Sequence, residues 1–361
     1  MGRNLDIAIA GAGPAGLAAA LYLKRAGHKV TVFERFDSPK PLGSGLILQP
    51  TGLTVLADLG LLDDILALGS RIERLHGTDA KSGRTVLEVR YDARRGRRFG
   101  LAVHRAALFG VLYRAALREA IAIETNVEIE ALETGERASL VCGNGKRLGP
   151  FDLVVDASGA RSKLRQCLGD PSMPRPLTYG AFWASLTWRD GFDQRALLQR
   201  YDKASVMVGV LPIGRPQPGA ETMAAFFWSL KPDDADQVRE AGLDAWKARV
   251  ISVWPDCEAF TSQIESFDHC PSAKRNDAVS LSLCAKSAAS TKRSRSTWPT
   301  SLLAVSPSGT SDSCVAGSRR TRASVMPNFD RRPTRISSSS ASSSSPAIEE
   351  VTAGVSETVS A

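Results

Sequence analysis

Residues 5–16 read Leu-Asp-Ile-Ala-Ile-Ala-Gly-Ala-Gly-Pro-Ala-Gly, an apolar run that ends in glycines spaced as Gly11-x-Gly13-x-x-Gly16. The apolar run predicts a short buried strand, and the proline after the second glycine predicts a helix over 14–25. Glycines in this spacing permit a tight turn and let the backbone approach a pyrophosphate, which the free N–H groups at a helix N-terminus can bind. This stretch therefore predicts the strand, turn and helix that begin a dinucleotide-binding fold.

An acidic residue completes the motif. Glu34 lies 23 residues after Gly11, at the end of a second strand expected over 30–33. A carboxylate at this place can accept hydrogen bonds from both hydroxyls of a ribose and disfavours a 2′-phosphate, so the expected dinucleotide is FAD or NAD rather than NADP. The alternative, a glycine-rich turn that only packs a helix on a sheet, does not explain Glu34.

The segments that follow alternate between helix and strand, which favours an α/β fold. We expect helices over 53–68 and 104–118, and strands over 121–132, 140–142 and 152–155. From residue 179 on, segments rich in Trp, Phe, Val and Met are separated by Pro and Gly turns, which predicts a second, largely antiparallel sheet. Its expected strands span 182–188, 205–211 and 223–230, and an amphipathic helix follows over 242–254.

Composition limits the class of protein. The 361 residues are 43% hydrophobic and 23% charged, as in a globular protein of about two domains. There is no apolar run of about 18 residues that would span a membrane, and the first residues lack the pattern of a secretory signal. The six cysteines are scattered and the four histidines show no metal-ligand spacing. We therefore expect a cytoplasmic protein with no disulfide framework and no metal site.

The last quarter of the chain differs from the rest. Residues 271–361 contain 24 serines, 12 Lys or Arg and 6 Asp or Glu, so they carry +6 of the net charge of +8. A nucleic-acid-binding protein would carry the basic face on its body, so we expect no nucleic-acid partner. The segment has too little apolar residue to offset the roughly 1–2 kcal/mol per residue that backbone ordering costs. We expect it to be disordered.

Five motifs occur together in the first 170 residues. They are the glycine motif, Glu34-Arg35, Pro41-Leu-Gly-Ser-Gly45-Leu-Ile-Leu-Gln49-Pro50, His104-Arg105-Ala-Ala-Leu108 and Asp152-Leu-Val-Val-Asp156-Ala-Ser158-Gly159-Ala-Arg161-Ser162-Lys-Leu-Arg165. Over about residues 5–268 the chain resembles the class A flavoprotein monooxygenases of the p-hydroxybenzoate hydroxylase and salicylate hydroxylase-like type. The resemblance implies an FAD-binding domain of Rossmann type over 1–170, with an excursion into the substrate domain at about 71–97. A substrate domain over 171–268 and the Ser/Arg-rich tail over 269–361 would follow.

The resemblance also implies roles for individual residues. Glu34 would bind the adenosine ribose, with Arg35 near the adenine, and Arg105 would reach the FAD. The turn from Gly43 to Gly45 would run beside the flavin ring, where only glycine lets the backbone come so close. The alternative to cofactor contact for Arg105 is that it is a solvated charge at the start of a helix. The alternative for Gln49 is that it only marks the point where a helix begins. The expected cofactor-binding residues are Gly11, Gly13, Ala15, Gly16, Glu34, Arg35, Gly45, Gln49, Arg105, Ser158 and Gly159.

Candidates for chemistry on the substrate are fewer. The aromatic residues Trp183, Trp188 and Phe227 are candidates for lining an aromatic pocket, with core packing as the alternative. Neither the residues nor the resemblance assigns a catalytic base.

The chain departs from the family pattern in two places. Ser158 precedes Gly159 where the family usually has Asp, which is implicated in FAD and NAD(P)H contacts. A serine can hydrogen-bond a phosphate or a water but carries no charge. The family's third FAD motif, a Gly-Asp followed by a Pro- and Gly-rich loop, is absent after Pro271. We hypothesise that the reading frame shifts near 269–279, and a natural Ser/Arg linker is the alternative.

The resemblance implies an FAD-dependent oxidoreductase. The most specific function that it implies is that of an NAD(P)H-dependent monooxygenase. Such an enzyme hydroxylates an aromatic or similar small molecule with O₂ through a flavin C4a-hydroperoxide. Two alternatives stay open. The absent third motif favours a truncated, non-catalytic flavin-binding relative, and Ser158 favours an FAD-linked reductase without oxygen insertion.

Overall fold

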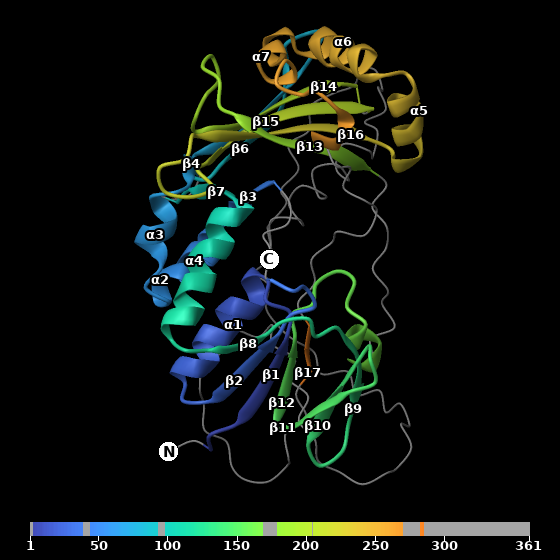
Figure 1. Ribbon diagram of the computed structural model, residues 1–361. Helices are drawn as coiled ribbons and strands as arrows, with labels where there is room; N and C mark the ends of the chain where they lie inside the picture. Colours follow the sequence, from blue (N-terminus) through green and yellow to red (C-terminus); the bar gives the residue numbers. More distant parts are fainter. Residues whose placement is uncertain are drawn as a thin grey trace, which may run out of the picture.

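The computed structural model describes residues 3–38, 44–92, 98–168, 179–203, 205–269 and 282–284. In Figure 1 the lower part is a five-stranded sheet with helices on it, and the upper part is a six-stranded sheet with helices on its outer side. A small three-stranded sheet lies between them. The expected fold class, α/β with a second and mainly antiparallel sheet, is confirmed. The disorder expected over 269–361 falls almost entirely outside the described residues.

The five-stranded sheet has the strand order β17-β12-β1-β2-β8. Its strands are β1 (Asp6–Ala10), β2 (Lys29–Phe33), β8 (Ala122–Glu124), β12 (Leu153–Asp156) and β17 (Ser282–Cys284). The first four run parallel, and β17 pairs antiparallel with β12. Their side chains are mostly apolar because both faces of the sheet are covered. The parallel register places Ala10 beside both Phe33 and Asp156, so the carboxyl ends of three strands meet at one edge.

Two helices that contact each other cover one face of this sheet, on its left-hand side in Figure 1. They are α1 (Pro14–Arg25) and α4 (Arg105–Arg118). Leu17 and Leu21 of α1 and Leu112 of α4 are buried in one cluster with Ile7 and Ile9 of β1. The apolar residues of α1 recur three to four positions apart, which is the spacing that turns one side of a helix toward a sheet.

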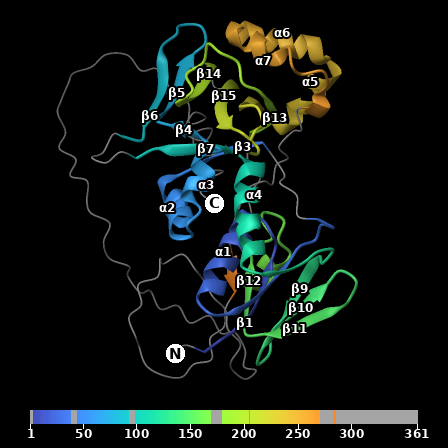
Figure 2. The ribbon, with the colours of Figure 1, turned by 60° about the vertical axis from the view of Figure 1, so that its left-hand side comes forward.

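A three-stranded antiparallel sheet covers the opposite face, as the turned view in Figure 2 shows. Its strands are β9 (Ile129–Glu133), β10 (Ala138–Cys142) and β11 (Arg147–Phe151). Leu140 and Phe151 pack against Ala8 and Phe33 of the parallel sheet. The Phe33 and Phe151 rings meet edge to face, with their centroids 5.9 Å apart.

A second three-stranded sheet joins the lower and upper parts. Its strands are β3 (Gly45–Leu48), β7 (Gly100–His104) and β4 (Ser70–Ile72), and it is accompanied by α2 (Pro50–Asp58) and α3 (Leu62–Leu66). Ile47, Ile72 and Ala102 from these strands are buried against Ile213 and Phe227 of the upper sheet. The two parts of the molecule therefore share one apolar cluster.

The upper sheet has the order β13-β16-β15-β14-β5-β6. Its strands are β5 (Arg74–Asp79), β6 (Thr85–Arg90), β13 (Gly180–Thr187), β14 (Ala196–Asp202), β15 (Val206–Gly214) and β16 (Met223–Leu230). All neighbours are antiparallel except β5 and β14, which run parallel. Side chains alternate along β13: Trp183 faces the joining sheet, whereas Phe182 and Ala184 face the outer helices. These helices are α5 (Ala235–Glu240), α6 (Leu243–Val253) and α7 (Glu258–Thr261).

Two expected elements differ in the structure. The helix expected over 53–68 is two helices, because Gly60 has a φ of +66° and ends α2. The strand expected over 121–132 is broken at Asn126, where φ is +57°, so that β8 joins the parallel sheet and β9 the small antiparallel one. Strand β17 lies inside the segment 269–361 and pairs antiparallel with β12.

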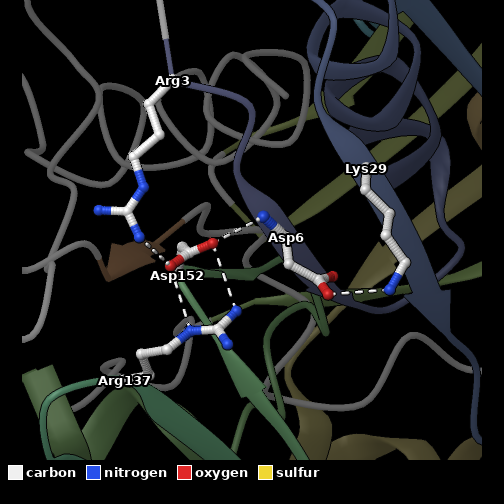
Figure 3. Close-up of polar contacts among 5 residues, drawn as sticks. All are labelled: Arg3, Asp6, Lys29, Arg137 and Asp152. Carbon is white, nitrogen blue, oxygen red and sulfur yellow. Dashed lines mark hydrogen bonds and ion pairs between the residues drawn. The ribbon is translucent and has the colours of Figure 1, made fainter.

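A polar cluster ties the amino ends of the parallel strands together (Figure 3). The Asp152 carboxylate accepts a hydrogen bond from the Asp6 N–H at 2.9 Å and from the guanidinium groups of Arg3 and Arg137. Asp6 in turn pairs with Lys29 Nζ at 2.9 Å. The N–H bond is the main reason that the pKa of Asp152 lies below its usual value, and the two arginines lower it further. The cluster lies at the sheet edge opposite the glycine motif.

Candidate functional site

The glycine motif follows β1 directly and packs against the turn after β12. Gly11 has a φ of +103°, and a Cβ at this position would lie 2.5 Å from the Ala157 carbonyl oxygen. A Cβ on Gly16 would lie 2.0 Å from the Gly11 carbonyl oxygen. Both positions must be glycine because neighbouring backbone occupies the space that a side chain would need.

The amino end of α1 faces open space. A Cβ on Gly13 would have no neighbour within 4 Å. Gly13 is the N-cap residue of α1, no side chain caps the helix, and its first turn contains no acidic residue. The N–H groups of Ala15 and Gly16 therefore remain available at the positive end of the helix dipole. This geometry suits an anion such as a pyrophosphate.

Glu34 holds the glycine motif from the side of β2. Its side chain is buried, with 8% exposure, and Oε2 accepts a hydrogen bond from the Ala12 N–H at 2.8 Å. Oε1 accepts from the Phe36 N–H at 3.2 Å. A carboxylate has about four acceptor positions, so two remain for ribose hydroxyls. Arg35 is exposed, and its guanidinium lies 4.6 Å from the centre of the Phe36 ring.

The turn after β12 is built around Asp156, which is 3% exposed. Its carboxylate accepts hydrogen bonds from the Ser158 N–H at 3.1 Å and from the hydroxyls of Ser158 and Ser162. The Ser162 N–H donates to the Gly159 carbonyl at 3.0 Å and closes the turn. Gly159 has a φ of +86°, and a Cβ there would have no neighbour within 4 Å.

Three predicted residues lie in a different place, around the joining sheet. A Cβ on Gly45 would lie 2.2 Å from Ile213 Cγ2, so the packing of the upper sheet already requires glycine at this position. Gln49 precedes α2 and hydrogen-bonds the Tyr91 hydroxyl, whose pKa is raised by burial. Arg105 is the first residue of α4, and its N–H donates to the Ser44 carbonyl at 2.9 Å.

The structure thus divides the predicted cofactor residues into two groups. One group lies at the carboxyl ends of β1, β2 and β12 and contains Gly11, Gly13, Ala15, Gly16, Glu34, Ser158 and Gly159. The other lies at β3, α2 and α4 and contains Gly45, Gln49 and Arg105. Arg35 directly follows Glu34, at the edge of the first group.

Of the three aromatic candidates for substrate contact, two lie together. The rings of Trp183 and Phe227 face the joining sheet, with their centroids 4.8 Å apart. Trp188 lies in the layer of the outer helices, 6.2 Å from Phe260. Trp188 directly follows β13 and still pairs through its N–H with the Thr222 carbonyl, so the alternation of extended chain turns it to the face opposite Trp183.

Asp156 is a residue of this turn that the sequence prediction did not include, and the Ser162 hydroxyl bonds it from the side of the next segment. The spacing Asp-x-Ser-x-x-x-Ser after an apolar strand contains the signal, because side chains two and six residues on can fold back to a carboxylate in a tight turn. Which hydroxyl reaches which oxygen depends on the path of that turn. Within the described part of the chain, no three His, Cys, Asp or Glu side chains are placed to hold a metal ion. The helices described there are also too short or too polar to cross a membrane.

Comparisons with known proteins place the chain among FAD-binding proteins. A family profile described as FAD binding domain matches residues 4–253. The 3-amino-4-hydroxybenzoate 2-monooxygenase of Streptomyces cremeus is 33% identical over 168 residues, which are 45% of this chain and 42% of that protein. The phenazine 1,6-dicarboxylic acid hydroxylase of Lysobacter antibioticus is 31% identical over 252 residues, 66% of this chain and 61% of that protein. The chain therefore spans less than two thirds of the length of these curated relatives.

A solved structure shows the same fold. The tetrameric form of 2-methyl-3-hydroxypyridine-5-carboxylic acid oxygenase superposes with a TM-score of 0.64 and 20% sequence identity. The superposition covers 78% of this chain and 72% of that one. At this identity the likeness concerns the arrangement of helices and strands.

Proposed function

This chain belongs to the family described as FAD binding domain, as its motifs predicted, and from that membership we propose that it is an FAD-dependent monooxygenase. It would use NAD(P)H and O₂ to hydroxylate an aromatic or similar small molecule. The observation that carries the proposal is the family match over residues 4–253 together with the glycine motif and Glu34, which lie in contact at one sheet edge. The names of the relatives, which include hydroxybenzoate and phenazine hydroxylases, support the reaction class.

The residues of the sheet edge fit FAD. The open side of Gly13 and the N–H groups of Ala15 and Gly16 suit the pyrophosphate, which carries negative charge. The Glu34 carboxylate keeps acceptor positions for the two ribose hydroxyls. The pyrophosphate and Glu34 would not compete for the same donor. The Ala12 N–H is already bonded to Glu34, and the N–H groups of Ala15 and Gly16 are left for the pyrophosphate.

The protein's contribution to the reaction would be placement. FAD, when bound, supplies the electron transfer and the activation of O₂. The α1 N-terminus and Glu34 would fix the adenine end of the cofactor. The Trp183 and Phe227 pair faces the joining sheet and offers apolar ring surface to an aromatic substrate. Gly45 would keep the joining sheet close to the upper sheet, through its contact with Ile213.

The test begins with the visible absorption spectrum of the purified protein, before and after addition of FAD and desalting. We expect retained flavin bands, followed by NAD(P)H oxidation that phenols stimulate and by a hydroxylated product. NAD(P)H oxidation without such a product for any phenol would support the reductase alternative. A colourless protein that retains no added FAD would overturn the proposal.

We also propose a reducing, cytoplasmic location. Cys142, Cys167 and Cys257 are free thiols in the structure, and the first and last of them are buried. Burial raises the pKa of the Cys142 and Cys257 thiols, which keeps both sulfurs in their unreactive protonated form.

A further inference from the structure

In the turn after β12, the Ser158 hydroxyl already donates its proton to a hydrogen bond within the turn. Ser158 is exposed, and its Oγ–H donates to Asp156 Oδ1. A carboxylate oxygen accepts hydrogen bonds, so Ser158 is the donor in this bond. The same carboxylate accepts from the Ser158 N–H and the Ser162 hydroxyl, which hold it in place. The Ser162 oxygen accepts from the Leu164 N–H at 3.1 Å and extends the cluster into the next segment.

The fixed direction decides what Ser158 can recognise. A hydroxyl has one donor proton and two acceptor lone pairs. Because the proton of Ser158 is bonded to Asp156, its oxygen offers only acceptors to a ligand. The oxygens of a pyrophosphate are acceptors too, so they cannot hydrogen-bond to this oxygen. A sugar or sugar-alcohol hydroxyl can donate to it.

The turn lies where a bound dinucleotide would reach it. The Ser158 Cα is 3.0 Å from the position of a Cβ on Gly11, and the Ala157 N–H donates to the Ala10 carbonyl at 2.8 Å. The glycine motif therefore rests on the peptide before Ser158. Glu34 holds the same motif from the other side through Ala12.

We propose that Asp156 is a positioning residue that makes Ser158 an acceptor for a hydroxyl group of the bound cofactor, on its ribose or its ribityl chain. Asp156 acts through Ser158 and does not itself touch the cofactor. The proposal rests on the proposed function, because the ligand it describes is FAD. It replaces the expectation that Ser158 donates to a phosphate.

The first test is the dissociation constant for FAD, measured by quenching of flavin fluorescence. We expect S158A to weaken FAD binding by roughly tenfold, the value of one hydrogen bond. S158T keeps the hydroxyl and should stay within about threefold of the wild type. D156N should weaken binding as S158A does, because the amide can donate to the Ser158 oxygen and so free the serine proton to point outward.

The second test distinguishes acceptor from donor. In the double variant D156N/S158D the carboxylate at position 158 offers acceptors to the cofactor. The asparagine amide at position 156 can donate a hydrogen bond to that carboxylate. We expect this variant to recover FAD affinity to within about threefold of the wild type. Had Ser158 donated to a phosphate, the new carboxylate would repel that phosphate, and the double variant would bind FAD more weakly than D156N. That result, or an unchanged affinity in S158A, would overturn the proposal.

Titration with ADP separates the two hydroxyl sources. If S158A also weakens ADP binding, the donor is on the adenosine ribose. If it weakens only FAD, the donor is on the ribityl chain. Either result names the cofactor hydroxyl, and the double variant decides whether Ser158 accepts from it.

S162A is the matched control, because it removes a hydroxyl from Asp156 but leaves the bond from Ser158 intact. We expect its FAD affinity within about twofold of the wild type, with thermal unfolding recorded for every variant to identify a fold defect. The failures of the two proposals can be told apart. A wild-type protein that binds no FAD contradicts the proposed function. A wild-type protein that binds FAD while S158A and D156N bind it equally well contradicts the present inference alone.

Discussion

At the scale of single residues, the three glycines of the motif are required for different reasons. Gly11 and Gly16 face backbone atoms at 2.5 and 2.0 Å from where a Cβ would lie, whereas Gly13 faces open space. The first two are therefore needed for the fold, and the third leaves room for a ligand. A sequence pattern that treats the three alike does not contain this distinction.

Alanine substitutions separate these reasons. G16A should lower the free energy of unfolding by about 1–3 kcal/mol, because the new methyl overlaps the Gly11 carbonyl oxygen and forces the backbone to move. G13A should change it by less than about 0.5 kcal/mol, since its φ of −70° suits alanine and the space is empty. Urea unfolding of both variants measures the difference. Equal stability of the two variants would contradict the packing argument.

The site could be predicted from the sequence where spacing alone determines it. The strand–helix–strand order and the lengths of its segments bring Glu34, at the end of the second strand, next to the Gly11 to Gly16 motif. The sequence therefore predicts that these residues lie together. The role of Asp156 could not be predicted in the same way. It depends on which hydroxyls the turn brings to the carboxylate, and that is decided by the Gly159 φ of +86° and by the contact of Ala157 with β1.

At the scale of secondary-structure elements, predictions held where an apolar period ran without interruption. The helix over 14–25 has the bounds expected of it, because proline begins it and no glycine with positive φ interrupts it before Gly27. The helix expected over 53–68 failed at Gly60, and the strand expected over 121–132 failed at Asn126. Both residues adopt the left-handed conformation, which the apolar pattern around them does not reveal. Strand β14 was not expected at all, because its inward residues include the polar Gln199.

The elements of the parallel sheet are held at their amino ends by Asp152, and this contact should depend on pH. Its folded-state pKa is lowered, first by the bond from the Asp6 N–H, so the contribution to stability is present above the unfolded pKa of about 3.9. It is lost as the pH falls through the lower folded-state pKa. D152N should cost about 1–3 kcal/mol at pH 7 and should flatten the acid limb of the stability curve. Denaturant titrations between pH 2.5 and 7 measure both effects.

D193N serves as the control for this prediction. Asp193 also pairs with an arginine, Arg74, at 3.1 Å, but both side chains are more than a third exposed. Exposed pairs contribute little, so D193N should change stability by less than about 1 kcal/mol. A D152N variant that is no less stable than D193N at pH 7 would show that the Asp152 cluster does not stabilise the sheet.

At the scale of the whole molecule, the lower and upper parts meet through close contacts of the joining sheet. Gly45 packs against Ile213 and Ala225, and the Ser44 and Ser185 hydroxyl oxygens lie 2.7 Å apart. Two such contacts, one apolar and one polar, fix the upper sheet at the end of β3. The relative position of the glycine motif and the Trp183 and Phe227 pair therefore depends on a residue without a side chain.

A double-mutant cycle tests this contact. G45A should cost about 1–3 kcal/mol of unfolding free energy, because the added methyl would lie 2.2 Å from Ile213 Cγ2. An I213A background removes the 2.2 Å contact and leaves the Cβ atoms of residues 213 and 225 at 3.1 and 3.2 Å, so the further cost of G45A should fall to about 1 kcal/mol. The cycle is measured by urea unfolding of the four proteins. The same cost of G45A in both backgrounds would show that Ile213 is not what excludes a side chain at residue 45.

The contact of Gly11 with Ala157 also has a consequence for synthesis of the chain. Gly11 and the Ala157 peptide touch, although they directly follow neighbouring strands and lie as far apart in the sequence as Asp6 and its partner Asp152. A ribosome adds residues in order, and it releases the start of the glycine motif long before the peptide on which that motif rests. The glycine motif therefore cannot make its folded contact with Ala157 until residue 157 has been synthesised.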